Sequence, residues 1–256
     1  MKIIDCHIHL DRYDESEQKQ ILSDMEKVHL ESLLTVSMNL TSSINNDQLS
    51  LKDSRIKPAF GFHPEQPLPS EEEVNELLDW MWEHRHNMVA VGEIGLPYYL
   101  RQENPNMDTS GYVEILERLL AFAKEVEKPV ILHAVHGDAP IVCDLLEKHQ
   151  ITMAHFHWFK GDTRTVERMA EKGYHISITP DVCYEREIQE LVLAYPLKLM
   201  MIETDGPWPF EGIFKGKWTH PAMMHESVRK IASIKGLPIE DVYEILYQNT
   251  KDFYHI

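Results

Sequence analysis

The chain has 256 residues, and its 25 basic and 42 acidic side chains give a formal net charge of −17 at pH 7. This charge disfavours an extended duplex-binding surface, which needs a basic patch, but it is compatible with a small phosphorylated substrate held by metal ions. No apolar run approaches the roughly 18 residues of a membrane span, no secretory signal pattern is present, and the 3 scattered cysteines make no disulfide framework. These features predict a cytoplasmic protein with no membrane association and no obligate protein partner.

Eight short apolar segments have the length and residue types of buried strands. They are Lys2–Cys6, Ser32–Ser37, Lys57–Phe60, Met88–Val91, Pro129–Leu132, Thr152–Ala154, Gly173–Ile178 and Leu197–Ile202. Helix-like stretches lie between them or after the last one: Ser70–Arg85, Gly111–Glu127, Pro140–His149, Asp162–Lys172, Tyr184–Tyr195, Pro221–Lys235 and Pro238–Phe253. Strands that alternate with helices indicate βαβ units and a parallel sheet. Eight such units in about 250 residues predict an α/β fold, a TIM-type (β/α)8 barrel that residues 1–256 form as a single domain.

Histidine and carboxylate side chains recur where the predicted strands end. His7 and His9 close the first strand two residues apart, so both side chains point to the same side of it. The later strand ends carry His63, Glu93, His133, the pair His155 and His157, and Asp205. In a barrel of this type these ends meet at one face, where active sites are built. Imidazole and carboxylate groups without thiolate predict a site for divalent ions such as Zn²⁺, Mn²⁺, Mg²⁺ or Fe²⁺.

The motifs around these side chains resemble those of one known family. They are Asp-x-His-x-His-Leu (5–10), Gly-x-His-Pro (61–64), Gly-Glu-Ile-Gly-Leu (92–96), Pro-Val-x-x-His (129–133), His-x-Phe-x-Gly (157–161), Glu-Thr-Asp-x-Pro (203–207) and a final Asn-Thr before Phe253. Together they cover nearly the whole chain. On these motifs the chain resembles the TatD family of metal-dependent deoxyribonucleases, within the amidohydrolase superfamily.

The resemblance implies a site with two divalent ions. His7 and His9 would bind the first ion, His133 and His157 the second, and Glu93 would bridge them. Asp205 would contact metal and handle a proton, so that Asp205 and Glu93 are the implied catalytic residues. The family motif selects His157 over His155, because only His157 has Phe at +2 and Gly at +4. The implied activity is the attack of a metal-activated water on a phosphoester bond.

Three further histidines, His63, His136 and His155, are expected to face the substrate or to support the ligands from behind. The chain departs from the family pattern at three places. Pro97 stands where the family has Asp, Val135 stands where it has Arg, and His220-Pro221 replaces Asn-Pro. An Arg at position 135 would clamp a phosphate with two parallel hydrogen bonds; here His136, Lys160 or Lys215 could take its place.

Three functions are compatible with the sequence. The leading one is hydrolysis of a phosphoester bond in a small molecule or in single-stranded nucleic acid. The second is amidohydrolase-type hydrolysis of a small amide, ester or lactone. The third is metal binding without turnover, which the presence of Asp205 disfavours because structural sites are normally closed. Aromatic residues follow strands six and eight, and they either stack on a base or sugar or only wall the pocket: Trp158, Phe159, Trp208, Phe210 and Trp218.

Overall fold

One parallel sheet of eight strands, in the order β1 to β8, forms the centre of the computed structural model, which describes residues 1–256. The strands are β1 (Ile3–Ile8), β2 (Leu30–Thr35), β3 (Ile56–Phe60), β4 (Ala90–Gly95), β5 (Val130–His133), β6 (Ala154–Phe156), β7 (His175–Ile178) and β8 (Met200–Ile202). The first and last strands lie side by side. Beyond them, the Asp205 amide donates to the His7 carbonyl oxygen at 2.9 Å. This nearly closed ring confirms the predicted (β/α)8 barrel.

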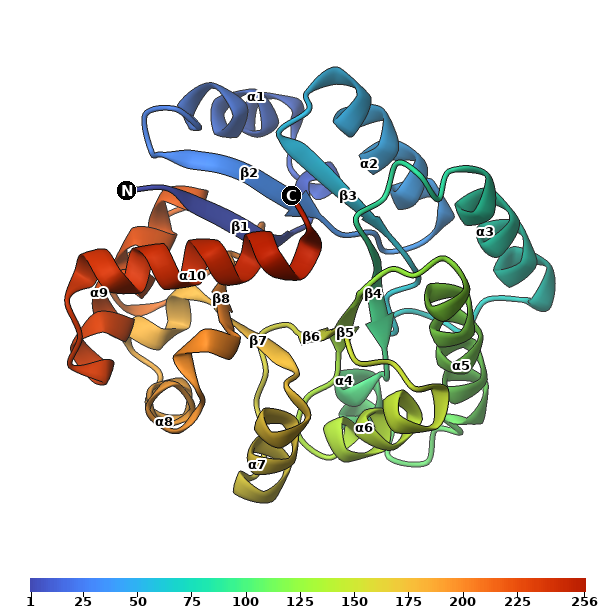
Figure 1. Ribbon diagram of the computed structural model, residues 1–256. Coiled ribbons are helices and arrows are strands. Elements are labelled where there is room, and N and C mark those ends of the chain that lie inside the picture. The colour runs from blue at the N-terminus through green and yellow to red at the C-terminus, as the bar shows by residue number, and fades with distance from the viewer.

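Helices surround the ring of strands (Figure 1). They are α1 (Glu15–Asp24), α2 (Leu40–Lys52), α3 (Glu71–Glu83), α4 (Tyr98–Glu103), α5 (Ser110–Glu125), α6 (Asp138–His149), α7 (Thr163–Lys172), α8 (Arg186–Ala194), α9 (Met224–Lys235) and α10 (Ile239–Tyr254). The sequence did not predict α1, α2 or α4. The short α4 buries no residue fully. The inner face of α2 is polar: Asn46 is buried and bonds to Thr35 Oγ1 at 2.7 Å and to the Val36 carbonyl at 3.0 Å. Neither helix therefore shows the apolar periodicity on which the prediction relied.

Several predicted strand boundaries differ from the structure. The strand β4 continues through Gly95, so that Glu93 lies within the strand and not after it. Similarly, β6 begins at Ala154 and includes His155, which was expected to follow the strand. Residues 197–199 form a 3₁₀ turn, which leaves only Met200–Ile202 as β8. The functional side chains therefore come from the last residues of the strands as well as from the loops beyond them.

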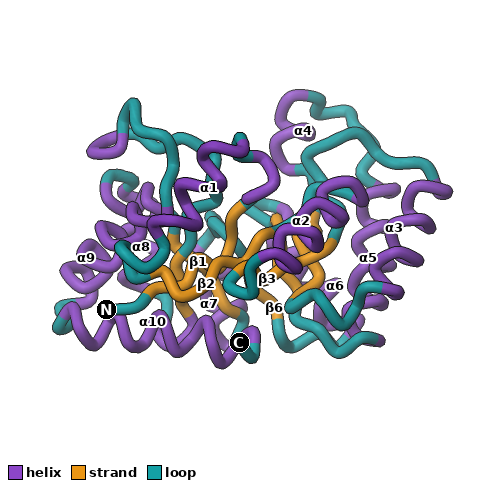
Figure 2. The backbone as a smooth tube through the Cα atoms, turned by 90° about the horizontal axis from the view of Figure 1, so that it is seen from above, coloured by secondary structure: helices purple, strands orange, loops and turns teal.

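The interior of the barrel is filled by small and medium apolar side chains, which are Ile4, Cys6, Leu34, Val36, Ala59, Ala90, Ile131 and Met201. Phe253 and Tyr254 at the end of α10 pack against this cluster. Figure 1 shows α10 lying across one end of the strands, and Figure 2 shows α10 and both chain termini on one side of the molecule, with α4 on the other. One end of the barrel is thus closed by the C-terminal helix, and the functional side chains gather at the other end.

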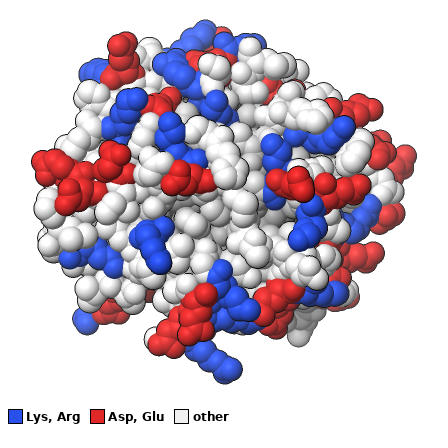
Figure 3. Space-filling model, in the orientation of Figure 1, with Lys and Arg blue, Asp and Glu red and all other residues white.

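The surface carries charges of both signs. In the view of Figure 3, acidic and basic side chains are interspersed over the face that α10 crosses, without a continuous basic stripe. None of the helices combines the length and the apolarity that crossing a bilayer requires.

Candidate metal centre

Glu93 lies at the centre of a ring of imidazoles at the carboxyl ends of the strands. Its Oε2 is 3.2 Å from His7 Nε2 and 3.3 Å from His9 Nε2. Its other oxygen, Oε1, is 2.7 Å from His157 Nε2, 2.9 Å from His133 Nδ1 and 3.4 Å from His63 Nε2. The two carboxylate oxygens therefore face two separate groups of histidines.

Asp205 lies on the His7 side of this ring. Its Oδ1 is 3.3 Å from His7 Nε2 and 3.5 Å from His9 Nε2. The six side chains that the sequence placed in the metal site thus converge, and His63 joins them beside Glu93. Four triads satisfy the spacing expected of metal ligands. Two of them include Glu93, namely His7 with His9 and Glu93, and His63 with Glu93 and His133; the other two include Glu203, namely His7 with His157 and Glu203, and Cys6 with His155 and Glu203.

The ring contains buried polar atoms that lack a hydrogen-bond partner. They are His7 Nδ1 and Nε2, His9 Nδ1, Glu93 Oε2 and His157 Nδ1. Buried polar atoms are almost always satisfied in folded proteins, because an unmet one costs about 1–3 kcal/mol. So many orphaned imidazole and carboxylate atoms within a few ångströms of one another fit a site built to receive divalent cations.

The charges of the ring are strongly coupled. Burial and the neighbouring His157 oppose protonation of His7, but Glu93 and Asp205 outweigh them and raise the pKa of His7 to about 9. Burial also works against the ionised form of Glu93, yet the imidazoles, with His157 foremost, hold the pKa of Glu93 well below its usual range. The pKa of Asp205 is lowered against burial by its contact with His7. Without metal, the site therefore balances carboxylates with protons on histidines, and binding of cations must release those protons.

Glycines allow β4 to carry Glu93 into the ring. A Cβ on Gly95, whose φ is +159°, would lie 1.9 Å from the His133 carbonyl oxygen, and a Cβ on Gly92 would lie 2.6 Å from Cβ of Ile131. Side chains at these two positions would push β5 away from β4. The Gly-Glu-Ile-Gly motif therefore combines a ligand with the close backbone approach that brings His133 to it.

Buried Asp5 joins the ends of β1 and β8. Its Oδ1 accepts the backbone N–H of Thr204 at 3.0 Å and that of His7 at 3.3 Å, and its Oδ2 accepts the Thr204 hydroxyl. Burial raises the pKa of Asp5 to about 7. Asp205, with a left-handed φ of 48°, follows Thr204 directly. Asp5 thus fixes the two backbone segments that present His7 and Asp205.

His155 and His136 lie outside the ring. His155 points into the barrel beneath it, where Nδ1 is 2.6 Å from the Tyr254 hydroxyl and Nε2 is 2.6 Å from Ser177 Oγ. Ser177 in turn donates to Glu203, whose Oε1 is 3.6 Å from His157 Nδ1. His136 lies at the rim, where its ring is 4.9 Å from that of Tyr98. His157 thus lies in the ring beside Glu93, whereas His155 lies beneath it and is linked to Glu203 through Ser177.

Glu65 is a candidate site residue that sequence inspection missed. Its Oε1 is 3.2 Å from His133 Nε2 and accepts the Tyr99 amide at 2.7 Å, while Oε2 accepts the Leu100 amide at 2.8 Å. Because Nε2 of His133 faces Glu65, Nδ1 is directed at Glu93. Glu65 therefore orients His133 and ties the first turn of α4 to the rim. Its position two residues after His63 was the only available signal, since α4 was not predicted.

We expect Glu65→Gln to weaken metal binding by about 10–100-fold, as is usual when the partner behind a metal-binding histidine is lost. The neutral amide keeps an acceptor for α4 but no longer stabilises the N–H on His133 Nε2. Calorimetric titration of the metal-free protein with Mn²⁺ or Zn²⁺ measures the change. Glu71→Gln, at an exposed first-turn position of α3, is the matched control and should bind as wild type does. Equal affinity in the two variants would contradict the role of Glu65.

The rim aromatics fall into two groups. Phe159 and Phe210 are buried, and Phe210 packs with Phe214 and Met223 beside Trp158. Trp208 and Trp218 are exposed. The buried rings, Phe159 and Phe210, therefore form part of the pocket wall, whereas the rings of Trp208 and Trp218 are exposed at the rim.

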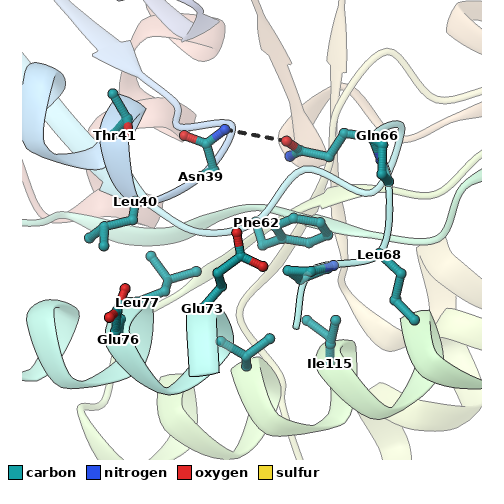
Figure 4. Close-up of a pocket in the computed structure, with 13 residues that line it drawn as sticks. Asn39, Leu40, Thr41, Phe62, Gln66, Leu68, Glu73, Glu76, Leu77 and Ile115 are labelled. Carbon is teal, nitrogen blue, oxygen red and sulfur yellow. Dashed lines mark hydrogen bonds between the residues drawn. The ribbon is translucent and has the colours of Figure 1, made fainter. Parts of the chain in front are cut away.

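A separate hollow of about 530 Å³ lies between the start of α2 and the helices α3 and α5. Figure 4 shows Phe62, Gln66 and Leu68 on one of its walls and Leu77 and Ile115 near another, with Asn39 and Gln66 joined at 3.3 Å. No histidine or cysteine lines this hollow. It is not part of the metal centre.

A barrel with a ring of histidines and carboxylates at the carboxyl ends of its strands defines the class of metal-dependent hydrolases. The chain belongs to the TatD-related DNase family, whose model matches residues 4–255.

Two curated relatives are similar over nearly the full chain. A Haemophilus influenzae protein described as an uncharacterized metal-dependent hydrolase is 38% identical over 257 residues, which cover 99% of this chain and 100% of that protein. A human deoxyribonuclease is 27% identical over 256 residues, covering 96% and 92% of the two chains. Together with the family, these relatives identify a TatD-type metal-dependent hydrolase.

Solved structures agree on the fold. A TatD homologue from Escherichia coli superposes with a TM-score of 0.85 at 22% identity, covering 99% of this chain and 98% of that one. A TatD-family hydrolase from Entamoeba histolytica superposes with a TM-score of 0.82 at 19% identity, with the same coverage.

Proposed function

We propose that this hydrolase cleaves phosphodiester bonds in single-stranded nucleic acid or short nucleotide fragments, using a pair of divalent ions on the two sides of Glu93. The division of the histidines between Oε1 and Oε2 of that carboxylate is the observation that carries the proposal. Membership of a DNase family favours a phosphoester over the small amide, ester or lactone that the sequence left open.

The proposed ligands follow the two groups around Glu93. His7 and His9, with Asp205 beside them, would hold one ion, and His133 and His157 the other, while His63 lies close enough to Glu93 to complete the second group. The donor set suits Zn²⁺, Mn²⁺, Fe²⁺ or Mg²⁺. When bound, such a pair of ions polarises a phosphoryl oxygen and lowers the pKa of water.

The protein's own groups supply the proton transfers and the orientation. Asp205 is ionised at neutral pH, since contact with His7 lowers its pKa, so its carboxylate can accept a proton from the attacking water and pass it to the leaving oxygen. Glu93 supplies negative charge between two cations and reduces their repulsion. Glu65 contacts the outer nitrogen of His133 at 3.2 Å, and Glu203 lies 3.6 Å from the outer nitrogen of His157.

Cationic side chains at the rim are candidates for the substrate phosphate. Arg101 of α4 pairs with Asp138, and its Cζ lies 5.9 Å from the ring of Tyr98, which contacts His136. Lys160 lies 5.4 Å from the ring of Trp158. The sequence offered His136, Lys160 and Lys215 as replacements for an Arg at position 135, and the structure adds Arg101. Arg101 offers the planar guanidinium fork that phosphate recognition favours.

The test is a substrate panel. Protein stripped of metal is reloaded with Mn²⁺, Mg²⁺ or Zn²⁺ and assayed on single-stranded and duplex oligonucleotides, bis-p-nitrophenyl phosphate, p-nitrophenyl acetate and a simple lactone. We expect cleavage of the single strand and of the phosphodiester with at least one metal, and none after chelation. Hydrolysis of only p-nitrophenyl acetate or the lactone would contradict the phosphodiesterase proposal and indicate that the protein hydrolyses carboxylic esters. Inactivity on the whole panel with ions bound would contradict catalysis.

A further inference from the structure

The loop that follows β8 exposes two tryptophans at the rim of the metal centre. Trp208 is 60% exposed and Trp218 is 42% exposed. In the same loop, Phe210 and Phe214 are buried and form a small apolar cluster with Met223. The loop therefore has an apolar core of its own, and the two tryptophans are not part of it.

Hydrogen bonds hold both tryptophans close to Asp205. The Trp208 amide donates to the Asp205 carbonyl at 3.2 Å, which closes a four-residue turn and keeps their Cα atoms within about 7 Å. Thr219, the neighbour of Trp218, donates its hydroxyl to the Trp208 carbonyl. Tyr13 donates to the Thr219 carbonyl at 2.9 Å. The two tryptophans thus extend from neighbouring backbone segments, and hydrogen bonds connect both segments to the end of β8.

No other aromatic ring stacks face to face on either indole ring. Trp218 meets Tyr13 at an interplanar angle of 77° and His220 at 89°, so both contacts are T-shaped and neither is a stack. Trp82, on α3 at the outside of the barrel, offers a contrast. It is 43% exposed, but its ring carries the guanidinium of Arg85 at 4.4 Å. The exposed ring of Trp82 is thus in contact with a cation of the protein, whereas no Lys or Arg side chain lies over the ring of Trp208 or Trp218.

The charge of the segment adds to the aromatic signal. Residues 212–220 contain Lys215 and Lys217 and no acidic side chain, in a chain of net charge −17. Lys215 pairs with Glu211, directly before this segment, at 3.1 Å, so Lys217 is the cation of the segment that has no acidic partner. Both lysines are exposed, and Lys217 adjoins Trp218. Proteins that hold single-stranded nucleic acid combine aromatic rings, on which bases stack, with cations that follow the phosphates. A locally basic, aromatic loop beside an acidic protein's metal centre is complementary to that ligand.

We propose that Trp208 and Trp218 form a stacking platform for the bases of a single strand whose phosphodiester lies at the metal centre. The inference rests on the proposed phosphodiesterase function, and it commits that function to a polynucleotide or oligonucleotide substrate. Lys217, which adjoins Trp218, would face the phosphates that flank the stacked bases. The platform recognises the flat surface shared by all bases, so it implies little sequence preference.

Steady-state kinetics on the full-length, metal-loaded protein test the platform. With an oligothymidylate substrate, Trp208→Ala and Trp218→Ala should each raise KM by about 5–100-fold and change kcat little, the range expected for loss of one stacked base. A strand of the same length with abasic sites should bind wild type about as weakly as the intact strand binds the variants. Trp82→Ala is the matched control and should keep the wild-type KM.

Fluorescence supplies a readout that does not depend on turnover. Oligothymidylate should quench tryptophan emission of the protein in EDTA, and the double variant Trp208→Ala/Trp218→Ala should lose most of that quenching. Unchanged KM in both variants, while wild type cleaves the strand, would overturn the platform and leave the phosphodiesterase proposal standing. Quenching that depends on the two tryptophans, in a protein that cleaves no phosphodiester, would support the platform and refute the proposed function. Absence of both effects would overturn the platform.

Discussion

Asp205→Asn is expected to lower kcat for phosphodiester hydrolysis by about 10²–10⁴-fold, the range for loss of a positioned general base. The amide keeps the size of the side chain and an oxygen beside His7, but it cannot accept a proton. His7, His9 and Glu93 remain on that side of the ring, so ions should still bind. The defect should therefore be in kcat and not in the metal content.

The position of Asp205 supports this division of roles. Its carboxylate lies 3.3 Å from Nε2 of His7 and 3.5 Å from Nε2 of His9. Its backbone is anchored by a hydrogen bond that the Asp205 amide donates to the His7 carbonyl oxygen. The low pKa caused by contact with His7 means that the base form is present throughout the neutral range. As the pH falls through that low pKa, Asp205 gains a proton. Wild-type activity should therefore decrease in acid for the same reason that the Asn variant is expected to have a low kcat.

Measurement of kcat together with metal content by elemental analysis tests the assignment. Asp47→Asn serves as the control, because Asp47 is also buried but lies on α2, where it accepts from Asn87 at 2.9 Å. That variant should keep wild-type kcat. Full activity of Asp205→Asn with the normal metal content would remove Asp205 from the proton transfer. Loss of the ions would instead make it mainly a ligand.

The ring of ligands was predictable because strand geometry is local. Two histidines at i and i+2 on a strand share a side whatever the rest of the fold does. A parallel barrel then brings the other strand ends to the same face. The placement of His7, His9, His133 and Asp205 at one face follows from these two rules, whereas the choice of His157 over His155 came from the family motif. For the same reason, small errors in the boundaries of β4 and β6 did not alter which side chains converge.

Other parts of the site depend on contacts that no local pattern contains. Glu65 acquires its position only because the loop after β3 meets the first turn of α4 and the side chain of His133. The buried polar face of α2 depends likewise on Asn46 meeting the end of β2. His155 lies within β6 and not after it, and its position in the barrel interior depends on contacts with Tyr254 and Ser177. In each case tertiary contacts, and not periodicity, decide the outcome.

Glu93→Gln is expected to have the larger effect of the two substitutions in the ring, with activity reduced by at least about 10³-fold, because in the proposed site this carboxylate would position both ions. Each oxygen of Glu93 contacts a different group of histidines, so a neutral amide weakens both halves of the site. Metal titration should show fewer than two ions retained at concentrations that saturate wild type. The matched control is Glu76→Gln, an exposed position on α3.

The metal-free protein gives a second, independent measurement of the role of Glu93. In this state the ionised Glu93 carboxylate pairs with protonated His7, whose pKa is raised to about 9. The stabilisation from this pair is therefore fully present below the unfolded-state histidine pKa of about 6.5. It is lost as the pH rises through about 9. Removing one partner of a buried pair costs about 3–5 kcal/mol. Thermal unfolding in EDTA should therefore show Glu93→Gln less stable than wild type at pH 6–7, with a difference that shrinks above pH 9. A difference independent of pH would mean that Glu93 acts through packing and not through its charge.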